Sequence, residues 1–417
     1  MRVLVCGGGI SGLTLALALH AVEIDVYVYE ACPEVEELGV GINVMPHAMR
    51  ELTELGLADE LAKTGVETSE LVMFNRHGQQ VWREPAGLAE GYLWPQYSIH
   101  RGHLLGLLYR ACLERLGPDR VQTSKEGVSH SQEADGASLH FADGTTARGD
   151  VVAGADGVGS AIRAQLYPEE GPPLWNGQTM FRAVALVEPP LTGRSMVLIG
   201  HEGRRAVMYP ISAPGPDGRA QVNLTLDAQI AEGRPMPRHD GRHEVDRREV
   251  REPFEAMHFD WIDLGALIDA AQQWWQYPMA DRDPLPRWSF GRVTLLGDAA
   301  HPMYPVGSNG ASQAIIDART LAHALAVKGS VEAALETYES SRRPVTSAVV
   351  TANRDLTAVK CLELAEERAP NGFDNIDDVF APGELQALSD AYKRIAGFVP
   401  VELNHRPSLS VTQPRIS

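Results

Sequence analysis

The sequence predicts an α/β (α+β) protein in which a Rossmann-like parallel sheet covered by helices is interleaved with an antiparallel sheet and followed by C-terminal helices. A strand, a glycine loop, a helix and a second strand open the chain at residues 3–30. Two further buried strands, 151–155 and 293–296, each lead into a glycine–aspartate pair and then a helix. Residues 69–97 and 173–290 have alternating strand patterns with turn signals between them.

The composition is that of an ordinary globular protein, with two domains or one elaborated α/β domain. The 417 residues are 44% hydrophobic, and the mean hydropathy is −0.18. The formal net charge of −18 argues against binding to nucleic acid or to an anionic membrane, since both favour a basic patch. The longest mostly apolar run, residues 13–22, is too short to span a bilayer.

The cysteines point to a reducing compartment. All four are scattered, without a CxxC pair or metal-ligand spacing, so we expect reduced thiols, no bound metal and a cytoplasmic location. The glycine motif begins at Gly7, so we also expect no targeting peptide ahead of it.

The N-terminal unit has the complete pattern of a dinucleotide-binding fingerprint. In order, it comprises a strand at 3–6, GxGxxG glycines at Gly7, Gly9 and Gly12, a helix of small residues at 13–21, a strand at 24–29, and Glu30. Such glycines allow a tight turn, close approach of a pyrophosphate and close helix–strand packing, and the acid binds a ribose diol. We therefore predict a bound ADP moiety. Glu30 favours an unphosphorylated ribose, so the cofactor is FAD or NAD.

Two arginines on predicted helices are considered for ligand contacts. Arg50 lies on a helix over about 47–55, where a solvated helix face is the favoured interpretation. Arg101 begins the next helix and can reach a phosphate or a ribityl chain, with an ordinary surface arginine as the alternative. Asp156 and Gly157 follow a buried strand at the carboxyl edge of the parallel sheet, where open α/β sheets bind ligands.

The block at residues 173–290 is the predicted substrate domain. Its candidate strands are 180–187, 195–200, 206–211 and 220–226, with Pro and Gly clusters at 212–219 and 233–241 and a helical pattern over 244–273. An antiparallel sheet laid over the nucleotide-binding unit would enclose an aromatic-lined pocket. The candidate lining residues, for each of which an ordinary core position is the alternative, are Phe181, Arg182, Met208, Tyr209, Trp274 and Trp275.

The stretch 293–325 combines a strand, an acid, a loop rich in Gly and Pro, and a helix with one apolar face. The carboxylate of Asp298 can accept hydrogen bonds from a sugar or ribityl diol. The loop amides and the helix N-terminus favour an anion. The alternative is an ordinary connection in which Asp298 only caps a turn.

The C-terminal residues are predicted to be a helix over about 331–366, a break at residues 370–372 and a tail over the last dozen residues. Residues 361–390 carry eight acidic residues against Arg368 alone. The domain prediction assigns 1–68, 98–172 and 285–350 to the nucleotide-binding domain, 69–97 and 173–284 to the substrate-binding sheet domain, and 351–417 to C-terminal helices and a tail.

The chain resembles the single-component (group A) FAD-dependent aromatic hydroxylases, the para-hydroxybenzoate hydroxylase family, through three signatures: GGGISG with Glu30, GADG at 154–157, and GDAAHPMYPVGSNGA at 297–311. The stretches LGVGINVMPHA, WPQYSIHRG and QYPMADRDPLPRW are similar to the branch that contains methylphenazine-carboxylate hydroxylase and the salicylate-hydroxylase-like enzymes. The resemblance covers roughly residues 1–350 and implies the para-hydroxybenzoate hydroxylase fold. Asn309 is a departure, because many members carry Gln or Lys there.

The resemblance implies a set of cofactor contacts. In a bound, non-covalent FAD, the first motif would hold the ADP part, Asp298 the ribityl chain, and Arg101 would contact the cofactor. Pro305 would lie beside the isoalloxazine ring, and the amides of 310–312 would face its pyrimidine end. Asp156-Gly157 would serve the binding of both FAD and NAD(P)H. The implied cofactor-binding residues are Gly7, Gly9, Ser11, Gly12, Glu30, Ala31, Arg101, Asp156, Gly157, Asp298, Pro305, Gly307, Gly310, Ala311 and Ser312.

The resemblance also implies a reaction cycle. NADH or NADPH reduces FAD, O₂ adds at flavin C4a, and the C4a-hydroperoxyflavin delivers an electrophilic oxygen to an aromatic or heteroaromatic ring. Pro305 and Gly310 make up the catalytic flavin environment, in which the helix N-terminus matches the negative charge of the reduced flavin. No acid or base is assigned, although Tyr209 and His100 are candidates for a base that a phenol would need. Hydroxylation at a carbon that bears a carboxylate would expel CO₂, and Arg182 is the candidate for binding such an acid.

The predicted substrate is a small, flat polycyclic or heteroaromatic molecule, and its candidate contacts are Phe181, Arg182, Tyr209 and Trp275. The alternatives are another FAD oxidoreductase, such as a dehydrogenase or epoxidase, and a non-enzymatic flavin-bound redox sensor that binds a partner through the acidic segment 361–390. We expect no nucleic-acid or membrane partner, and a monomer or a homodimer.

Overall fold

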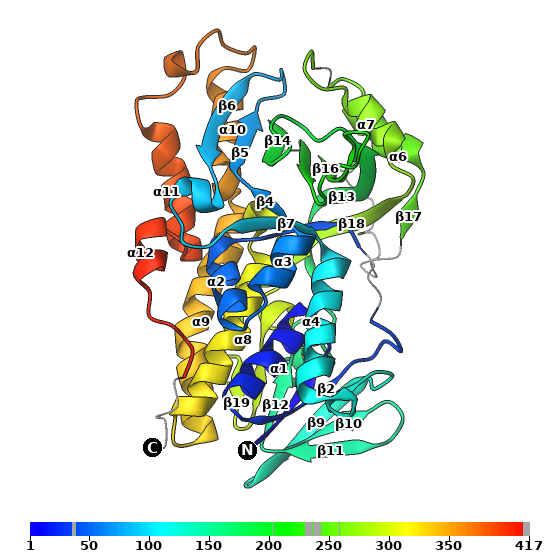
Figure 1. Cartoon of the computed structure of the whole chain (residues 1–417), viewed down its shortest axis with the longest axis vertical. Coiled ribbons are helices and arrows are strands. Elements are labelled where there is room, and N and C mark those ends of the chain that lie inside the picture. Colours follow the sequence, from blue (N-terminus) through cyan, green and yellow to red (C-terminus); the bar gives the residue numbers. More distant parts are fainter. Residues whose placement is uncertain (36–38, 202, 230–235, 237–242, 258, 412–417) are drawn as a thin grey trace.

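A parallel sheet forms the centre of the nucleotide-binding unit. The computed structural model describes residues 1–35, 39–201, 203–229, 236, 243–257 and 259–411 (Figure 1). In this described part, one six-stranded sheet has the order β19 (Ser289–Phe290), β20 (Val293–Leu295), β12 (Val151–Gly154), β1 (Arg2–Cys6), β2 (Asp25–Tyr29) and β8 (Val121–Gln122). All neighbours are parallel except β19 and β20. The central strands β1 and β12 are mostly apolar because both faces of the sheet are covered, and Val3 and Val5 of β1 are completely buried.

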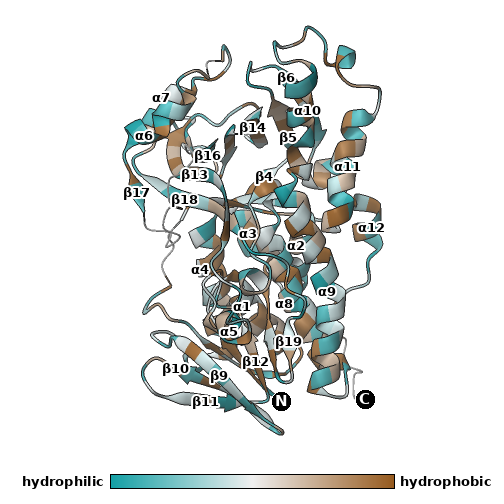
Figure 2. Cartoon of the chain, turned by 180° about the vertical axis from the view of Figure 1, so that it is seen from behind, coloured by the Kyte–Doolittle hydropathy of each residue, from teal (hydrophilic) through white to brown (hydrophobic). Residues whose placement is uncertain are grey.

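The helices that position the site pack on this sheet and on one another. They are α1 (Ile10–Ala21), α4 (Arg101–Leu116), α5 (Ala161–Leu166), α8 (Gly310–Val327) and α9 (Val331–Arg354). Helix α1 contacts both α4 and α8, and its small residues Gly12, Ala16 and Ala18 are buried. Figure 2 shows hydrophobic colouring on β12, whereas α6 and β11 at the periphery are largely hydrophilic.

A larger, mostly antiparallel sheet lies beside the nucleotide-binding unit (Figure 1). Its order within the described residues is β17 (Glu244–Val245), β18 (Trp274–Asp281), β13 (Leu174–Val187), β16 (Ala220–Gln229), β15 (Arg204–Pro210), β14 (Ser195–His201), β5 (Glu70–Phe74) and β6 (Gln80–Pro85). Only β14 and β5 run parallel. One face packs in a core with α6 (Arg247–Arg251) and α7 (Leu264–Ala270), which leaves the other face for the site.

Two small antiparallel sheets complete the strand structure that is described. One joins β3 (Gly41–Val44), β7 (Gln96–His100) and β4 (Val66–Thr68), and the other joins β11 (Thr146–Gly149), β10 (Gly136–Phe141) and β9 (Gly127–Glu133). The first sheet links the two units, since β3 contacts β16 and β7 contacts β15. The domain boundaries given above stay a prediction.

Three of the described helices lie near the C-terminus and pack on different parts of the molecule, and the first of them contacts β6 and β14. They are α10 (Lys360–Arg368), α11 (Glu384–Ala396) and α12 (Pro400–His405). Helix α11 contacts α9, and its Tyr392 and Ala396 share a core cluster with Val349 of α9. Among the described residues, no helix combines the length and apolarity needed to cross a bilayer.

Two helix predictions are wrong in extent. The helix expected over about 331–366 is divided, because Leu356 adopts a left-handed conformation (φ 53°) between α9 and α10. In the described part of 244–273, the expected helical pattern yields the short helices α6 and α7 and a 3-10 helix at Glu252–Phe254 after the strand β17. The predicted turn cluster at 233–241 lies, apart from residue 236, outside the described residues.

The prediction of a solvated Arg50 is also wrong. Arg50 is on α2 (Pro46–Glu54) and is 2% exposed. Its Nη2 donates hydrogen bonds to the carbonyl oxygens of Arg406 at 2.9 Å and Pro407 at 2.7 Å. The chain that follows α12 therefore covers this helix face, which local periodicity cannot indicate.

Candidate active site

The glycines of the loop after β1 have different surroundings. Gly7 and Gly12 leave no room for a side chain, whereas Gly9 leaves room for a ligand. A Cβ on Gly7, whose φ is +108°, would lie 2.4 Å from the oxygen of Ala155, and one on Gly12 would lie 2.0 Å from the oxygen of Gly7. These glycines let β1, β12 and α1 pack closely. A Cβ on Gly9, the N-cap of α1, would meet no atom of the described residues within 4 Å. An anionic group can therefore approach the helix N-terminus at Gly9.

Glu30 is held beside this loop at the end of β2. Its carboxylate accepts hydrogen bonds from the backbone N–H of Gly8 at 2.6 Å and of Cys32 at 2.8 Å. A carboxylate has about four acceptor sites, so acceptor capacity remains for a diol. The geometry matches an acid fixed in place to bind a ribose.

The loop between β20 and α8 carries the second group of ligand-facing residues. A 3-10 turn at Gly297–Ala299 brings the exposed Asp298 to the cavity wall. The chain continues through Pro305 into a turn at Val306–Ser308. Helix α8 then begins at Gly310, and no described side chain caps it. Its first backbone N–H groups are therefore available to an external acceptor.

Asn309 ties the 305–310 loop to the C-terminal helix α11. Its buried Nδ2 donates to the oxygen of Gly307 at 2.9 Å and to Tyr392 Oη at 3.1 Å. Burial raises the pKa of Tyr392, so its hydroxyl stays protonated and donates to Asn353 Oδ1 at 2.9 Å. A Cβ on Gly307 would lie 2.0 Å from Tyr392 Oη. The residue that departs from the family pattern is thus an anchor of the loop.

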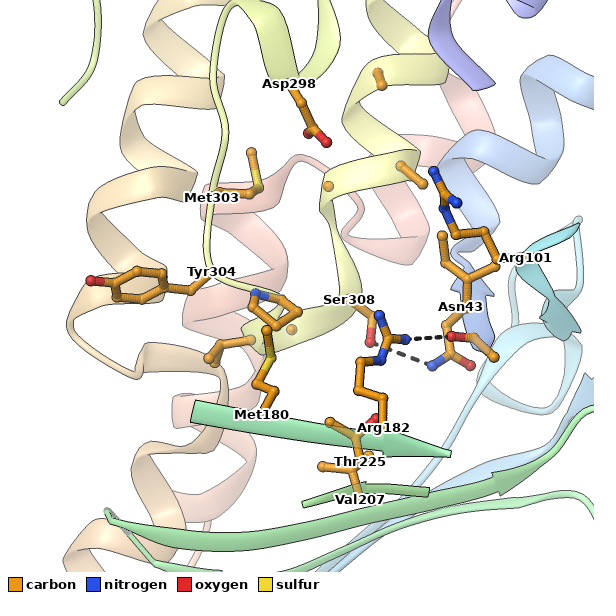
Figure 3. Close-up of a pocket in the computed structure, with 18 of the residues that line it drawn as sticks. Asn43, Arg101, Met180, Arg182, Val207, Thr225, Asp298, Met303, Tyr304 and Ser308 are labelled. Carbon is orange, nitrogen blue, oxygen red and sulfur yellow. Dashed lines mark hydrogen bonds between the residues drawn. The ribbon is translucent and has the colours of Figure 1, made fainter. Parts of the chain in front are cut away.

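A cavity of about 370 Å³ lies between the 305–310 loop, α1 and the eight-stranded sheet. In Figure 3, Asp298, Met303 and Arg101 approach it from the nucleotide-binding unit, and Arg182 and Thr225 approach it from the sheet. The described lining on the sheet side is Met180, Arg182, Met196, Leu198, Arg205, Val207, Tyr209, Thr225 and Asp227. The cavity therefore joins a polar, glycine-rich end to a sheet wall of mixed character.

Three charged residues of the sheet wall form a cluster, in which Arg205 and Asp227 are buried and Arg182 is half-buried. Arg205 Nε lies 3.5 Å from Asp227 Oδ2, and both side chains are nearly buried. Arg182 Nη2 donates to the oxygen of Gly41 at 2.7 Å. Among the described residues, Arg205 Nη1 and Nη2 and Arg182 Nε have no hydrogen-bond partner. Two guanidiniums beside one carboxylate leave one positive charge in excess. This excess charge and the unused hydrogen-bond donors both favour a bound anion.

The titration of the cluster follows from its burial. Burial raises the pKa of Asp227, and Arg205 and Arg182 oppose this rise. Burial also raises the pKa of Tyr209 to about 12, although Arg182 acts in the opposite direction. Tyr209 is therefore neutral near pH 7 and serves as a hydrogen-bonding group. His100 lies outside the described lining, and its ring centroid lies 4.7 Å from that of His103. Whether either residue acts as a base stays a prediction.

The structure brings together most of the predicted cofactor residues. Those at the cavity wall are Gly9, Ser11, Arg101, Gly157, Asp298, Pro305, Gly307, Gly310 and Ala311. The others among the predicted set lie behind or beside the described wall: Gly7, Gly12, Glu30, Ala31, Asp156 and Ser312. Asp156 accepts a hydrogen bond from Ser160 Oγ at 2.6 Å and one from Ile162 N at 3.2 Å, and Ser312 Oγ accepts one from Met45 N at 3.2 Å. The roles of these residues toward FAD stay predictions.

Strand alternation corrects several candidate lining residues. Phe181, Met208 and Trp274 are buried in the core on the opposite face of the sheet, because successive side chains of a strand point to opposite faces. Trp275 is paired with Arg182 across β13 and β18, but it lies outside the described lining. Of the four predicted substrate contacts, only Arg182 and Tyr209 reach the cavity.

The sequence interpretation missed Arg205 and Asp227, although a signal for them exists. On β15, Arg205, Val207 and Tyr209 are each two positions apart. Since every second side chain of a strand points to the same face, a Tyr209 that faces the cavity places Arg205 and Val207 on that face as well. Asp227 pairs directly with Arg205 across β15 and β16. A charged pair on the inward face of two adjacent strands is the pattern that would have identified them.

The comparisons with known proteins agree with this site. The chain matches the FAD binding domain family over residues 1–353. It is 43% identical over 404 residues to phenazine 1,6-dicarboxylic acid hydroxylase from Lysobacter antibioticus, covering 94% of this chain and 96% of that protein. It is 33% identical over 359 residues to 3-hydroxybenzoate 6-hydroxylase 1 from Aquipseudomonas alcaligenes, covering 85% and 88% of the two chains.

The fold is also similar to solved structures. HpxO of Klebsiella pneumoniae, solved with FAD and uric acid, has a TM-score of 0.73 at 25% identity and covers 95% of this chain and 93% of its own. A salicylate hydroxylase substrate complex has the same fold, with a TM-score of 0.75 at 22% identity over 100% of this chain and 99% of that chain. The predicted family, fold class and cofactor are confirmed. The chain belongs to the FAD-dependent aromatic hydroxylases, which are flavoprotein monooxygenases that use NAD(P)H and O₂.

Proposed function

We propose that this FAD-dependent monooxygenase hydroxylates an aromatic acid and binds the carboxylate through Arg205 and Arg182. The observation that supports the proposal most strongly is the pair of guanidiniums at the sheet wall, whose buried atoms Arg205 Nη1, Arg205 Nη2 and Arg182 Nε have no partner among the described residues. Unsatisfied buried donors are costly, and a planar carboxylate matches a guanidinium in geometry and charge. Two similar proteins are also named for aromatic acids, one as a phenazine dicarboxylic acid hydroxylase and the other as a hydroxybenzoate hydroxylase.

The residues present fit FAD as the cofactor. Gly9 leaves an open approach to the N-terminus of α1, Asp298 offers an exposed carboxylate, and the uncapped start of α8 at Gly310 offers backbone donors. These groups would hold the pyrophosphate, the ribityl chain and the pyrimidine end, respectively. When bound, FAD supplies hydride acceptance from NAD(P)H and the activation of O₂.

The chain contributes positioning, charge and the exclusion of water. The donors at the start of α8 stabilise negative charge in the cavity. Met180, Met196, Leu198 and Val207 provide apolar wall, which keeps water from competing with the aromatic substrate. Tyr209 is neutral because burial raises its pKa to about 12, so it can orient an oxygen or nitrogen of the substrate by a hydrogen bond.

The test compares Arg205→Gln with Arg204→Gln. Arg204 is the exposed neighbour on the same strand, so it controls for the loss of one positive charge. For an aromatic acid that stimulates NAD(P)H oxidation, we expect Arg205→Gln to raise KM about 10- to 100-fold, because a charge-assisted hydrogen bond contributes about 1.5–3 kcal/mol. Arg204→Gln should change KM less than about twofold.

The matched primary amide of the same acid provides the second control. The KM for the amide is expected to be high in the parent protein and nearly unchanged in Arg205→Gln, since the neutral amide forms no ion pair with Arg205. Equal effects of Arg205→Gln on the acid and the amide would contradict the proposal. The mass of the product then separates retention of the carboxyl group from its loss as CO₂.

We also propose that the protein works in the cytoplasm as a monomer or a homodimer. Among the described residues, Cys6, Cys32, Cys112 and Cys361 form no disulfide bond, which suits a reducing compartment.

A further inference from the structure

A second chamber lies beside the main cavity, on the side toward the C-terminal helices. It has a volume of about 90 Å³. Its described wall shares Met196, Leu198, Gly307, Ser308 and Val359 with the main cavity. The 305–310 loop and strand β14 therefore form walls of both spaces, next to the expected position of the flavin ring.

The additional space bears on how large a substrate can be. The main cavity has about 370 Å³, and part of it must hold the isoalloxazine ring. Pockets for drug-sized ligands have volumes of about 300–1,000 Å³. The space left for a substrate beside the isoalloxazine ring is therefore smaller than the whole main cavity, and the second chamber, which shares part of its wall, offers additional volume.

The chamber has an apolar wall and a charged end. Its apolar wall includes Leu71, Met73, Ala86, Ala358 and Phe398. The charged end is formed by Glu84 of β6, Glu90, and Ser389 and Lys393 of α11. Apolar walls around one polar end are typical of a site that orients a flat ring by a few hydrogen bonds.

The charged end contains an excess carboxylate. Lys393 Nζ donates to Glu84 Oε2 at 3.0 Å and also to Glu90 Oε1, and Ser389 Oγ donates to Glu84 Oε2 at 2.6 Å. Lys393 and Glu84 are 5% and 7% exposed. One ammonium thus faces two carboxylates, whereas an ion pair that only joined β6 to α11 would need one.

The excess negative charge is unfavourable without a further donor. Burial raises the pKa of Glu90 to about 7, against the opposing effect of Lys393. A carboxylate that is already partly desolvated gains from a hydrogen-bond donor on a ligand. A second anionic group would be repelled there.

We propose that the second chamber binds the distal ring of a fused polycyclic aromatic acid, with Glu84 and Glu90 accepting a hydrogen bond from a hydroxyl, amino or ring N–H group on that ring. The inference rests on the proposed function, because the acid at the near end of the substrate is assigned to Arg205 and Arg182. Ala358 lines the chamber but not the described wall of the main cavity, so the two spaces can be altered separately.

The test measures ligand binding to the FAD-loaded protein through the change in flavin absorbance. The three probes are 3-hydroxybenzoate, phenazine-1-carboxylate and 6-hydroxyphenazine-1-carboxylate. Ala358→Leu fills the chamber, so we expect it to raise Kd at least about tenfold for both phenazines and less than about twofold for 3-hydroxybenzoate. Ala358→Gly is the matched control, and it should bind all three probes about as the parent does.

Glu90→Gln tests the charged end at nearly constant volume. We expect it to raise Kd about fivefold for 6-hydroxyphenazine-1-carboxylate and to leave phenazine-1-carboxylate unchanged, since only the first carries a donor on the distal ring. Three results would each overturn the inference. The first is an equal rise in Kd for the one-ring and three-ring probes in Ala358→Leu, and the second is unchanged phenazine binding in that variant. The third is a parent protein that binds 3-hydroxybenzoate but no phenazine. These outcomes leave the proposed function intact, because that proposal fails only on the Arg205→Gln comparison of acid and amide.

Discussion

Gly12→Ala is expected to lower the free energy of unfolding by about 3 kcal/mol and to abolish FAD binding, whereas Gly9→Ala should fold normally and lose FAD binding alone. The added Cβ at Gly12 would lie 2.0 Å from the backbone oxygen of Gly7. Relief of that overlap requires α1 to move away from β1, and α1 also packs on α4 and α8. The helix that forms the pyrophosphate site would therefore be displaced together with part of the core.

Gly9→Ala separates ligand binding from folding. The backbone of Gly9 (φ −76°, ψ −174°) suits alanine, and a Cβ there would meet no described atom within 4 Å. The stability of the FAD-free protein should change by less than about 0.5 kcal/mol. Since Gly9 lines the cavity, the methyl group would occupy space needed by the pyrophosphate, and the Kd for FAD should rise at least about tenfold.

Urea unfolding of the FAD-free variants and titration with FAD measure these two effects. A Gly9→Ala protein that binds FAD like the parent would show that the pyrophosphate does not lie at the N-terminus of α1. A Gly12→Ala protein with parental stability would contradict the close packing of α1 on β1.

Asp298→Ala is expected to weaken FAD binding about 100-fold, so the purified variant should lose most of its yellow colour. Asp298 is exposed on a turn at the cavity wall. Its carboxylate can accept hydrogen bonds from the ribityl hydroxyls, each of which contributes about 1.5 kcal/mol or more to a charged acceptor. Alanine removes both acceptor oxygens without filling space.

Asp298→Asn provides a graded comparison for this prediction. It retains one acceptor oxygen and loses the charge, so its Kd for FAD should lie between those of the parent and Asp298→Ala. Flavin content after purification and the Kd from fluorescence titration measure the series. Full FAD occupancy of Asp298→Ala would instead support the alternative in which Asp298 only caps a turn.

The local part of the site was predictable from the sequence. Gly7, Gly9 and Gly12 follow β1 directly, and Glu30 closes the same unit. Asp298 and Gly310 lie on one continuous strand–loop–helix connection. Each of these predictions depends only on the spacing of neighbouring residues, because a strand followed by a tight glycine turn and a helix has essentially one geometry.

The sheet wall was predictable only in part, because burial on both faces hides the direction of each side chain. Phe181 and Arg182 are adjacent on β13, and only Arg182 faces the cavity. Both faces of this strand contain apolar residues, so no alternation of polar and apolar residues marks the inward face. The cavity-facing Arg205 and Asp227 become evident once the pairing of β15 with β16 is known.

Contacts made by the C-terminal residues could not be predicted. Asn309 and Tyr392, which hold the 305–310 loop, are 83 positions apart, and Arg50 is covered by a segment more than 350 positions away. Neither contact leaves a local signal, since each depends on how α11 and the chain after α12 pack against the rest of the molecule. The second chamber has the same origin, because Lys393 of α11 completes its charged end.

The source of the oxygen atom in the product is the most direct test of the assigned chemistry. The FAD-loaded protein would be supplied with NAD(P)H and an aromatic acid that stimulates NAD(P)H oxidation, under ¹⁸O₂ in unlabelled water, and the product would be analysed by mass spectrometry. We expect one ¹⁸O atom in each hydroxylated product molecule and no label when the isotope is supplied as water instead. Label that comes from water, or NAD(P)H oxidation that yields only hydrogen peroxide with every aromatic acid, would contradict the assignment as an aromatic monooxygenase.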